Sequence, residues 1–439
     1  MHGKTNPPSH DGPKGQINMT ILMVGGGGRE HALIRKLKES QRVTRILCAP
    51  GNGGIGCDAE CFPVAACDIP GMVALAKQEK ADLVVVAPDD PLAAGMVDAL
   101  EQNGIRAFGP NAAAAQIEAS KVFSKELMKK HGIPTAEYAV FDDATKAMEY
   151  IRSRGEYPVV VKADGLALGK GVIIAESETA AAGALKTIME DKAFGASGNQ
   201  VVVEEFLTGP EVSVLAFADG KTVRPMVSSK DHKRALDGNK GLNTGGMGTI
   251  SPNPYYDEAM AQRCSKEIFL PTMEAMRAEG RPFRGCLYFG LMLTPKGPKV
   301  IEYNARFGDP ETQVVLPLLK TDLVDIMEAV IDERLDAQSI EWSAGCAACV
   351  VMASGGYPGS YPKGIVIEGL DEGGQVSGAT VYHAGTKLED GKFVTAGGRV
   401  LGVTAVGDTM DEALERAYRA VEQIHFDGAH YRHDIGRIE

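Results

Sequence analysis

The stretch VVKADGLALGKGV, Val160 to Val172, joins a β-branched run to a glycine-rich turn. The run predicts a strand with Lys162 near its end, so that its ammonium group points to one face of a sheet. The glycines between Gly165 and Gly171 let backbone N–H groups approach an anion without a Cβ in the way. Together with Lys162 and Lys170 they predict a polyphosphate cradle. A hairpin turn with surface lysines is the alternative that this stretch alone leaves open.

Two familiar nucleotide motifs do not match. A Walker A loop has four residues between its glycines and then Lys-Ser/Thr, whereas Gly165 and Gly169 enclose three and Lys170 precedes a glycine. A dinucleotide fingerprint needs a further glycine and an acidic ribose partner about 20 residues on. The run GGGGREH from Gly25 lacks both, so a nicotinamide cofactor is disfavoured.

The N-terminal third reads as a parallel α/β sheet. Thr20–Val24, Ile46–Ala49 and Leu83–Ala87 are short apolar runs, typical of buried parallel strands. Turns rich in Gly or Pro follow them, and ligands bind beyond the carboxyl ends of such strands. We therefore expect Gly27, Gly28 and the Arg29 N–H to hold a phosphate at a helix start, with Pro50–Gly54 beside them.

A second informative stretch is KVIEYNARFGDPE, Lys299 to Glu311. In a strand, Glu302 and Asn304 share one face, and carboxylate and amide oxygens suit Mg²⁺. Arg306 follows and could pair with a transferring phosphoryl group. A solvated edge with an ordinary Glu–Arg pair is the alternative. The stretches together predict that the protein holds ATP with magnesium and moves a phosphoryl group.

Composition narrows the function classes. A chain of 439 residues with 44% hydrophobic residues predicts two to four domains with full cores. The formal net charge of −12 argues against nucleic-acid binding, which needs a basic field. No apolar run reaches the roughly 20 residues of a membrane span, and Met1–Asn18 shows no secretory signal, so we expect a cytoplasmic protein. Cys346 and Cys349 are expected to be buried strand thiols rather than metal ligands.

Several motifs occur together and in order. They are GGGGREHAL from Gly25, PGNGG from Pro50, FGPNAAAAQIEASK ending at Lys121, VVKADGLALGKGV from Val160, VEEFLTGPE from Val203, KDHKRALDGNKGLNTGGMG from Lys230, IEYNARFGDPETQ from Ile301 and VVMASGGYPGSY from Val350. On these motifs the sequence, from about Met19 to its C-terminus, resembles the phosphoribosylamine–glycine ligases (glycinamide ribonucleotide synthetases) of the ATP-grasp superfamily.

The resemblance implies a multidomain fold of the α/β and α+β classes. We expect an N-terminal parallel α/β domain, a central ATP-grasp domain with a small lid subdomain, and a strand-rich C-terminal domain. The expected boundaries are a disordered extension at 1–18, then domains at 19–120, 121–335 (lid about 138–206) and 336–439.

The resemblance also implies roles for particular residues. ATP would be held by Lys121, Lys162, Gly169, Lys170, Gly171, Glu204, Phe206, Leu207 and Glu211, with Glu204 at the adenine amino group and Glu211 at the ribose. The substrates would be held by Gly27, Gly28, Arg29, Asn52, Gly53, Asn243, Thr244 and Gly245. Glu302 and Asn304 would bind Mg²⁺ or Mn²⁺, and the catalytic residues would be Arg306, Asp231 and Lys233.

The implied reaction is an ATP-dependent ligation in purine biosynthesis. Glycine's carboxylate attacks the γ-phosphate of ATP to give glycyl phosphate and ADP. The amine of 5-phosphoribosylamine then attacks the acyl phosphate and releases inorganic phosphate. Positioning and charge neutralisation suffice for phosphoryl transfer, so no protein nucleophile is needed. The partners are thus small molecules, with no nucleic acid and no membrane, and the expected state is a monomer.

The sequence departs at two places from what the resemblance leads us to expect. Many ATP-grasp enzymes place a further metal-binding acid on the strand before Glu302, but the segment Gly285–Leu293 contains none. The loop Pro88–Pro91 carries two aspartates where this family has a glutamate.

Three alternatives remain at this point. The chain could be another ATP-grasp ligase or carboxylase of the purine or biotin pathways, which an assay of glycine against other carboxylates would separate. It could be a regulatory nucleotide-binding module, which the intact set of Lys162, Glu302, Asn304 and Arg306 argues against. A Rossmann oxidoreductase would require tighter binding of NADH than of ATP.

Overall fold

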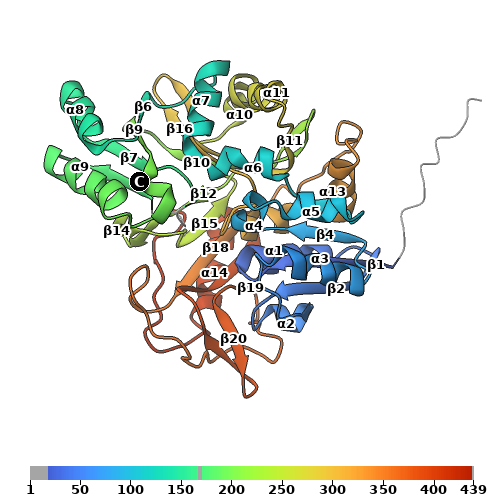
Figure 1. Ribbon diagram of the computed structural model, residues 1–439. Coiled ribbons are helices and arrows are strands. Elements are labelled where there is room, and N and C mark those ends of the chain that lie inside the picture. The colour runs from blue at the N-terminus through green and yellow to red at the C-terminus, as the bar shows by residue number, and fades with distance from the viewer. Residues whose placement is uncertain (1–17, 167–170, 438–439) are drawn as a thin grey trace, which may run out of the picture.

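The computed structural model describes residues 18–166 and 171–437. Its N-terminal part is a five-stranded parallel sheet of order β3-β2-β1-β4-β5, drawn in blue in Figure 1. The four residues of β4 are all buried, as expected of a parallel strand covered on both faces. The elements are β1 (Met19–Gly25), α1 (Gly28–Leu37), β2 (Val43–Pro50), α2 (Ile55–Asp58), β3 (Glu60–Cys61), α3 (Ile69–Gln78), β4 (Leu83–Val86), α4 (Asp89–Ala93), α5 (Met96–Gln102) and β5 (Ala107–Phe108).

Two helices, α6 (Ala112–Ala119) and α7 (Lys121–His131), lead into a small antiparallel sheet of order β6-β9-β7-β8. This lobe stands at the upper left of Figure 1, with α8 and α9 on its outer side. Its elements are β6 (Tyr138–Phe141), α8 (Ala144–Arg154), β7 (Val159–Ala163), β8 (Val172–Ala175), α9 (Glu178–Leu185), a π-helical turn (Lys186–Glu190), a 3₁₀ turn (Gly195–Asn199) and β9 (Val201–Glu205).

A second antiparallel sheet, of order β11-β10-β16-β17, faces this lobe. Its elements are β10 (Glu211–Asp219), β11 (Val223–Pro225), β16 (Arg284–Thr294) and β17 (Gly297–Asn304). The helices packed with it are α10 (Glu258–Cys264), a π-helical turn (Ser265–Phe269), α11 (Leu270–Ala278), α12 (Thr312–Val315), a 3₁₀ turn (Leu316–Leu318) and α13 (Leu323–Ile331). The central part of the chain therefore consists of two antiparallel sheets, one in the small lobe and one facing it.

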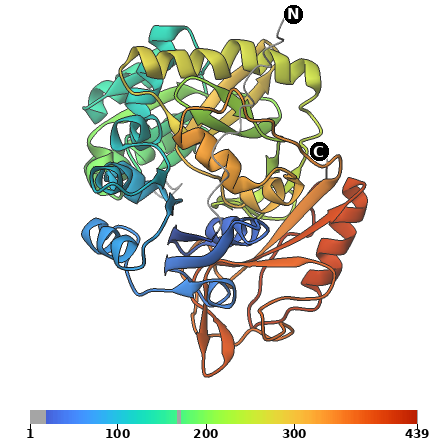
Figure 2. The ribbon, with the colours of Figure 1, turned by 90° about the vertical axis from the view of Figure 1, so that its right-hand side faces the viewer.

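The C-terminal part is built on a five-stranded sheet of order β12-β15-β18-β22-β19, drawn in orange and red at the bottom of Figure 2 apart from β12 and β15. A hairpin, β20–β21, projects from it, and α14 packs on β18 and β22. The elements are β12 (Lys230–Asp231), β15 (Gly248–Ser251), β18 (Cys346–Ala353), β19 (Thr380–His383), β20 (Thr386–Glu389), β21 (Lys392–Thr395), β22 (Arg399–Gly407) and α14 (Met410–Val421).

The segment from Ser228 to Pro254 is polar and rich in glycine, as loops often are, yet it is not one continuous loop. It contains β12, β15 and a hairpin of β13 (Arg234–Leu236) with β14 (Lys240–Asn243). β15 pairs with β18, about 100 residues away, as in Thr249 opposite Cys349. Strands therefore form in this segment by pairing with distant strands, which the local composition does not reveal.

One apolar core joins the parts. It contains Leu33 of α1, Phe217 of β10, Phe307 after β17 and Val351 of β18, all 3% exposed or less. The parallel sheet, the second antiparallel sheet and the C-terminal sheet thus share buried surface, which fixes the loops between them relative to one another.

Candidate active site

The carboxyl end of β17 presents two oxygen-bearing side chains on one face. Glu302 and Asn304 are partly exposed, whereas Tyr303 between them is buried at 3%. Opposite them on β16 lie Gly290, paired with Glu302, and Tyr288, paired with Asn304. A Cβ on Gly290 would lie 3.2 Å from Cγ of Glu302, so the glycine leaves room for that carboxylate.

Four cations surround the Glu302 carboxylate. Burial raises its pKa, but Lys233, Lys162, Lys121 and Arg306 together lower it below the usual value. Lys233 Nζ lies 4.0 Å from Glu302 Oε1. Three of these cations also pair with other acids, Lys162 with Glu204, Lys233 with Glu211 and Arg306 with Glu118. Ammonium and guanidinium groups gathered at one place are the donors that phosphate oxygens bind.

Lys121 and Lys162 approach from two sides. Lys121 Nζ donates to the carbonyl of Gly165 at 2.8 Å, and burial lowers the pKa of Lys121. Lys162 is 4% exposed and its Nζ donates to the carbonyl of Ile301, the residue before Glu302, at 3.1 Å. The structure brings both lysines to the end of β17. Of the predicted glycine loop, Gly171 is described and buried, while Gly169 and Lys170 lie outside the described residues.

Arg306 follows β17 and is held by a buried acid. Its Nη2 lies 3.0 Å from Oε1 of Glu118 and donates to Oδ1 of Asn304 at 3.4 Å. Glu118, at the end of α6, also accepts from the N–H of Ala305 at 2.6 Å. Nε of Arg306 is buried and has no hydrogen-bond partner among the described residues. A buried donor without a partner is a place where a ligand oxygen can bind.

The strand β12 brings Asp231 and Lys233 to the same region. Burial and the nearby Glu311 raise the pKa of Asp231 well above its ordinary value, against the opposing charges of Lys233 and Arg399. Glu211, 3.2 Å from Lys233 Nζ, is the main cause that raises the pKa of Lys233. Asp231 therefore keeps its proton to a higher pH than an ordinary carboxyl group, and Lys233 keeps its charge.

The predicted substrate residues of the β13–β14 hairpin are fastened by backbone contacts. Thr244 donates through both its N–H and its Oγ1 to the carbonyl of Lys233, each at 2.8 Å. Arg399 Nη1 donates to the carbonyls of Gly245 and Asp309, both at 2.7 Å. Asn243 is exposed. Arg399 thus ties the hairpin to the turn that follows β17.

The C-terminal segment clamps the same hairpin. Arg432, 1% exposed, forms a two-point pair with Asp434 at 2.7 and 2.8 Å and donates to the carbonyl of Arg234 at 3.1 Å. The N–H of Gly238 donates to Asp434 at 2.8 Å. The β13–β14 hairpin, which follows Lys233, is therefore fixed by residues nearly 200 positions away.

The N-terminal loops contribute chiefly backbone. Gly27 caps α1, and its N–H donates to Glu30 at 2.6 Å. Arg29 donates through Nη1 to the carbonyl of Phe307 at 2.8 Å. Asn52 uses both amide hydrogens, on the carbonyls of Gly26 and His383 at 2.9 and 2.8 Å, so its side chain holds the loop in place.

Two more predicted substrate glycines are tightly enclosed. Gly28 begins α1 and is buried, and a Cβ there would lie 2.7 Å from Nε2 of Gln313. Gly53 donates its N–H to the carbonyl of Thr386, and a Cβ there would lie 2.6 Å from Lys387 backbone. At Gly53 the obstacle is backbone, so that position needs glycine, whereas at Gly28 it is the end of the Gln313 side chain.

The end of β9, where Glu204 lies beside Lys125 and Lys162, continues into a segment that reaches the surface. Glu204 is 4% exposed, Phe206 is 39% exposed, Leu207 is partly exposed and Glu211 is exposed at the start of β10. An apolar ring at the surface beside polar groups suits a flat base. These residues connect the small lobe to the second antiparallel sheet.

Sequence reasoning missed several of these groups. Glu118 occurs within a helical segment and Arg399 at a strand start, so nothing local marks these two, and Lys125 also lies within a helix. The spacing of Lys121 and Lys125 by one helical turn is the one signal that could have found Lys125.

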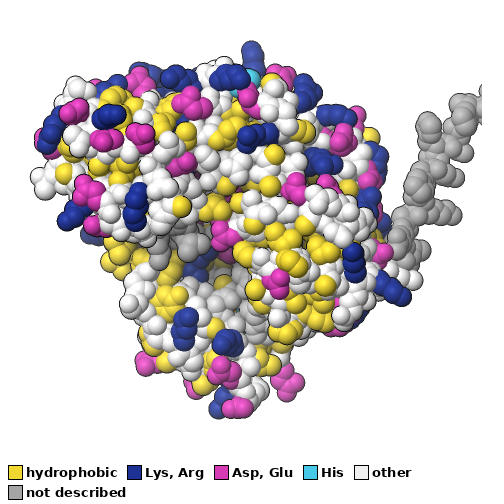
Figure 3. All heavy atoms as spheres, viewed as in Figure 1, with side chains coloured by type: hydrophobic (Ala, Val, Ile, Leu, Met, Phe, Trp, Pro, Cys, Tyr) yellow, Lys and Arg dark blue, Asp and Glu magenta, His cyan; other side chains and the backbone are white. Residues whose placement is uncertain are grey.

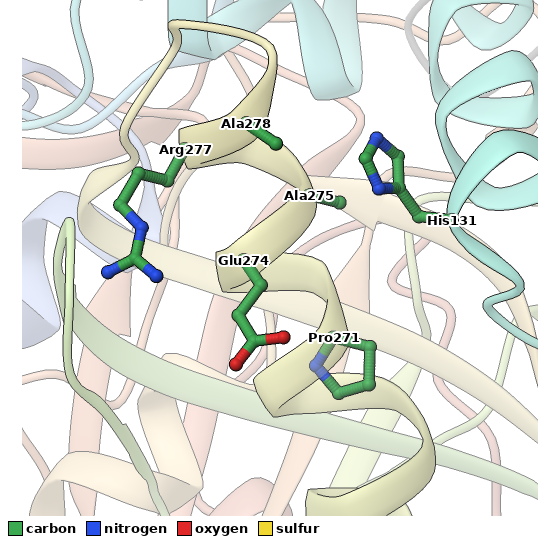
Figure 4. Close-up of a pocket in the computed structure, with 6 residues that line it drawn as sticks. All are labelled: His131, Pro271, Glu274, Ala275, Arg277 and Ala278. Atoms are coloured by element: carbon green, nitrogen blue, oxygen red, sulfur yellow. The ribbon is translucent and has the colours of Figure 1, made fainter.

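The surface is hollowed where the small lobe meets the rest of the molecule, and basic side chains show inside the hollow (Figure 3). A separate open depression of about 570 Å³ lies between α7 and α11 (Figure 4). It is lined by His131, Pro271, Glu274, Ala275, Arg277 and Ala278. None of the predicted site residues lines this depression, so it is distinct from the site at β17.

The residues present fit a divalent cation only in part. Glu302 is ionised and Asn304 supplies an amide oxygen, which suits a hard ion. In the described ranges no group of three or more His, Cys, Asp or Glu side chains forms a metal site. The protein therefore offers two oxygen ligands, and phosphate oxygens and water are needed to complete the shell.

Within residues 18–166 and 171–437, no helix has the length and apolar character that crossing a bilayer requires.

Comparison with known proteins gives a consistent result. Family models described as phosphoribosylglycinamide synthetase match in three parts: the N domain at 19–118, the ATP-grasp (A) domain at 119–312 and the C domain at 347–438. A phosphoribosylamine–glycine ligase of Caldanaerobacter subterraneus is 49% identical over 95% of this chain and 99% of its own length. The human trifunctional purine biosynthetic protein adenosine-3 is 48% identical, over 95% of this chain and 41% of its own length.

Solved structures agree. The phosphoribosylamine–glycine ligase of Thermotoga maritima superposes with a TM-score of 0.83 at 33% identity, covering 95% of this chain and all of that one. The biotin carboxylase domain of a Hydrogenobacter thermophilus 2-oxoglutarate carboxylase, in complex with MgADP, ADP and bicarbonate, has a TM-score of 0.72 at 17% identity, covering 95% of this chain and 92% of that one. The second likeness shows a shared fold alone. From the three family matches and the identities near 49%, the chain belongs to the phosphoribosylamine–glycine ligase family of ATP-grasp enzymes.

Proposed function

We propose that this protein joins glycine to 5-phosphoribosylamine at the expense of ATP, forming glycinamide ribonucleotide, ADP and phosphate in purine biosynthesis. The observation that carries the proposal is the cluster of Lys121, Lys162, Lys233 and Arg306 around the ionised Glu302. Family membership supports the substrate assignment, because relatives of nearly the same length are named for this reaction.

We assign the positioning of ATP and glycine to the following residues. Lys121 and Lys162 hold the phosphates, the segment from Glu204 to Leu207 binds adenine, and Glu211 binds the ribose. Asp231 and Lys233, with Asn243, Thr244 and Gly245, hold glycine against the γ-phosphate. Arg306 neutralises charge on the transferring phosphoryl group through the Nε that has no partner in the described structure.

Glu302 and Asn304 would hold Mg²⁺ or Mn²⁺, which supplies further neutralisation of phosphate charge when bound. The backbone of Gly27, Gly28, Arg29 and Gly53 faces the phosphoribosyl group, while Asn52 shapes that loop. Enclosure between the lobes excludes water and protects glycyl phosphate and the labile amine.

Domain limits, location and assembly complete the proposal. We infer domains at 19–120, 121–335 and 336–439 with a lid at about 138–206, although β12 and β15 cross into the C-terminal sheet. We place the protein in the cytoplasm as a monomer.

The test is release of ADP by the purified protein with each substrate omitted in turn. Release that requires both glycine and phosphoribosylamine supports the proposal. Release with bicarbonate or another carboxylate in place of glycine contradicts it, because it would indicate a different member of the superfamily.

A further inference from the structure

A buried ammonium group, that of Lys125, lies behind the proposed adenine site and has no role so far. Lys125 is 3% exposed and lies one turn after Lys121 in α7. Its Nζ lies 3.0 Å from Oε2 of Glu204 and donates to Oγ1 of Thr135 at 2.8 Å. Thr135 Oγ1 donates in turn to the carbonyl of Val300 at 2.7 Å. Lys125 therefore joins α7, β9 and β17 at one point.

The other oxygen of the same carboxylate is left without a hydrogen bond. Oε1 of Glu204 lies 3.0 Å from Nζ of Lys162, yet it is buried and accepts no hydrogen bond within the described structure. Lys162 therefore pairs with this oxygen by charge and makes no hydrogen bond of good geometry to it in the described structure, so the oxygen can still accept one from a ligand donor. The exocyclic amino group of adenine is such a donor, whereas guanine presents an oxygen there, which a carboxylate repels.

Contacts near Lys125 hold β9 against β17. Lys299 of β17 lies 2.6 Å from Glu205, the neighbour of Glu204, and Lys162 donates to the carbonyl of Ile301. The end of β9 is thus attached to β17 on both sides of the carboxylate. Loss of the Lys125 ammonium would leave Glu204 paired with Lys162 alone, which the phosphates also need.

We propose that Lys125 is a positioning residue that sets the base selectivity of the nucleotide site by holding the carboxylate of Glu204. The inference rests on the proposed function, because it needs adenine beside Glu204. Lys125 would act through Glu204, because its Nζ contacts Glu204 and Thr135.

The protonation of Lys125 gives a second testable property, a pH dependence of ATP binding. Burial lowers the pKa of Lys125 to about 8, against the opposing charge of Glu204. The charged groups that face it are Glu204 and Glu205 of β9 and Lys162 of β7, and its Nζ lies 5.7 Å from the ring of Tyr138 on β6. As the pH rises through about 8, Lys125 loses its charge, so the affinity for ATP should weaken above that pH.

The experiment compares the parent with Lys125→Met, Lys125→Arg and Lys129→Met. Lys129 is a matched control, because it is exposed on the same helix and also lies 5.7 Å from the Tyr138 ring. Calorimetry measures binding of ATP and of GTP between about pH 7 and 9.5, which spans the titration. Steady-state assays give kcat and the KM for ATP.

We expect Lys125→Met to raise the Kd and KM for ATP at least about tenfold, the lower end of what a charged hydrogen bond contributes. Its preference for ATP over GTP should fall, while kcat at saturating ATP is kept. Lys125→Arg should restore selectivity and abolish the weakening at alkaline pH, because arginine stays charged. Lys129→Met should match the parent.

The proposal is overturned if folded Lys125→Met binds ATP with the affinity, selectivity and pH dependence of the parent. If Lys125→Met fails to fold, Lys125→Arg provides the test. If the affinity of Lys125→Arg for ATP still weakens at alkaline pH, the positioning role of Lys125 is refuted. A parent protein that binds ATP but ligates no glycine would instead contradict the proposed function and leave the Lys125 comparison valid.

Discussion

Replacing Glu302 by glutamine tests the metal assignment most directly. The change keeps shape and removes one charge from the centre of four cations. For the contact of 4.0 Å with Lys233, Coulomb's law gives about 4 kcal/mol at an effective dielectric constant near 20. Both side chains are about one-third exposed, so solvent screening reduces the expected loss of stability to about 1 kcal/mol or less.

Turnover should respond far more strongly than stability. Loss of a group that merely supports a metal ligand costs about 10- to 100-fold, so loss of the ligand itself should lower kcat at least about 100-fold. The metal concentration for half-maximal activity should also rise. The kcat and the metal concentration for half-maximal activity are obtained by measuring ADP release in a titration with Mg²⁺ or Mn²⁺. The free energy of unfolding is measured separately by denaturation in urea.

A matched control is Glu328→Gln, which breaks the pair with Arg42 at 2.9 Å, in α13 and outside the site. It should lose a similar amount of stability and keep its turnover. A folded Glu302→Gln protein with near-normal kcat and unchanged metal dependence would falsify the assignment of Glu302 as a metal ligand.

Three further predictions use the same preparations. Lys162→Met removes a buried ammonium from the phosphate region and should raise the Kd for ATP at least about tenfold in calorimetry; unchanged affinity contradicts its role. Arg306→Lys keeps the charge but loses the planar fork, so kcat should fall about 100-fold with little change in KM, and an unchanged kcat would reduce Arg306 to a partner of Glu118. The pair with Arg432 holds the pKa of Asp434 below its usual 3.8, so its contribution to stability is present at neutral pH and is lost as the pH falls below about 4. The Tm of Asp434→Asn should therefore lie below that of the parent at pH 7 and approach it in acid, and a constant difference in Tm would refute the pair's contribution.

Much of the fold could be predicted from local patterns. The apolar runs of β1, β2 and β4 and the turns after them identify a parallel sheet, because strands buried on both faces need continuous apolar residues. The alternation in β17 places Glu302 and Asn304 on one face, and the structure agrees. These features depend on neighbours within a few residues, which the sequence displays directly.

Other parts of the site arise only from distant contacts. Lys125 and Glu204 lie 79 positions apart and meet because α7 packs behind β9. The Arg399 contacts with Gly245 and Asp309 depend likewise on the register of β22 in the C-terminal sheet. No local periodicity encodes such pairs, so they could not be predicted from composition or spacing.

The sequence by itself determined which chemical groups this protein brings to its chemistry: lysines and glycines for phosphates, and Glu302 and Asn304 for a hard cation. Only the tertiary structure decided that four positive groups surround one ionised carboxylate and that the Ser228–Pro254 segment forms strands rather than a loop. The physical reason is that charge effects and strand pairing depend on distances in space, and those are set by the packing of the three sheets on a shared core.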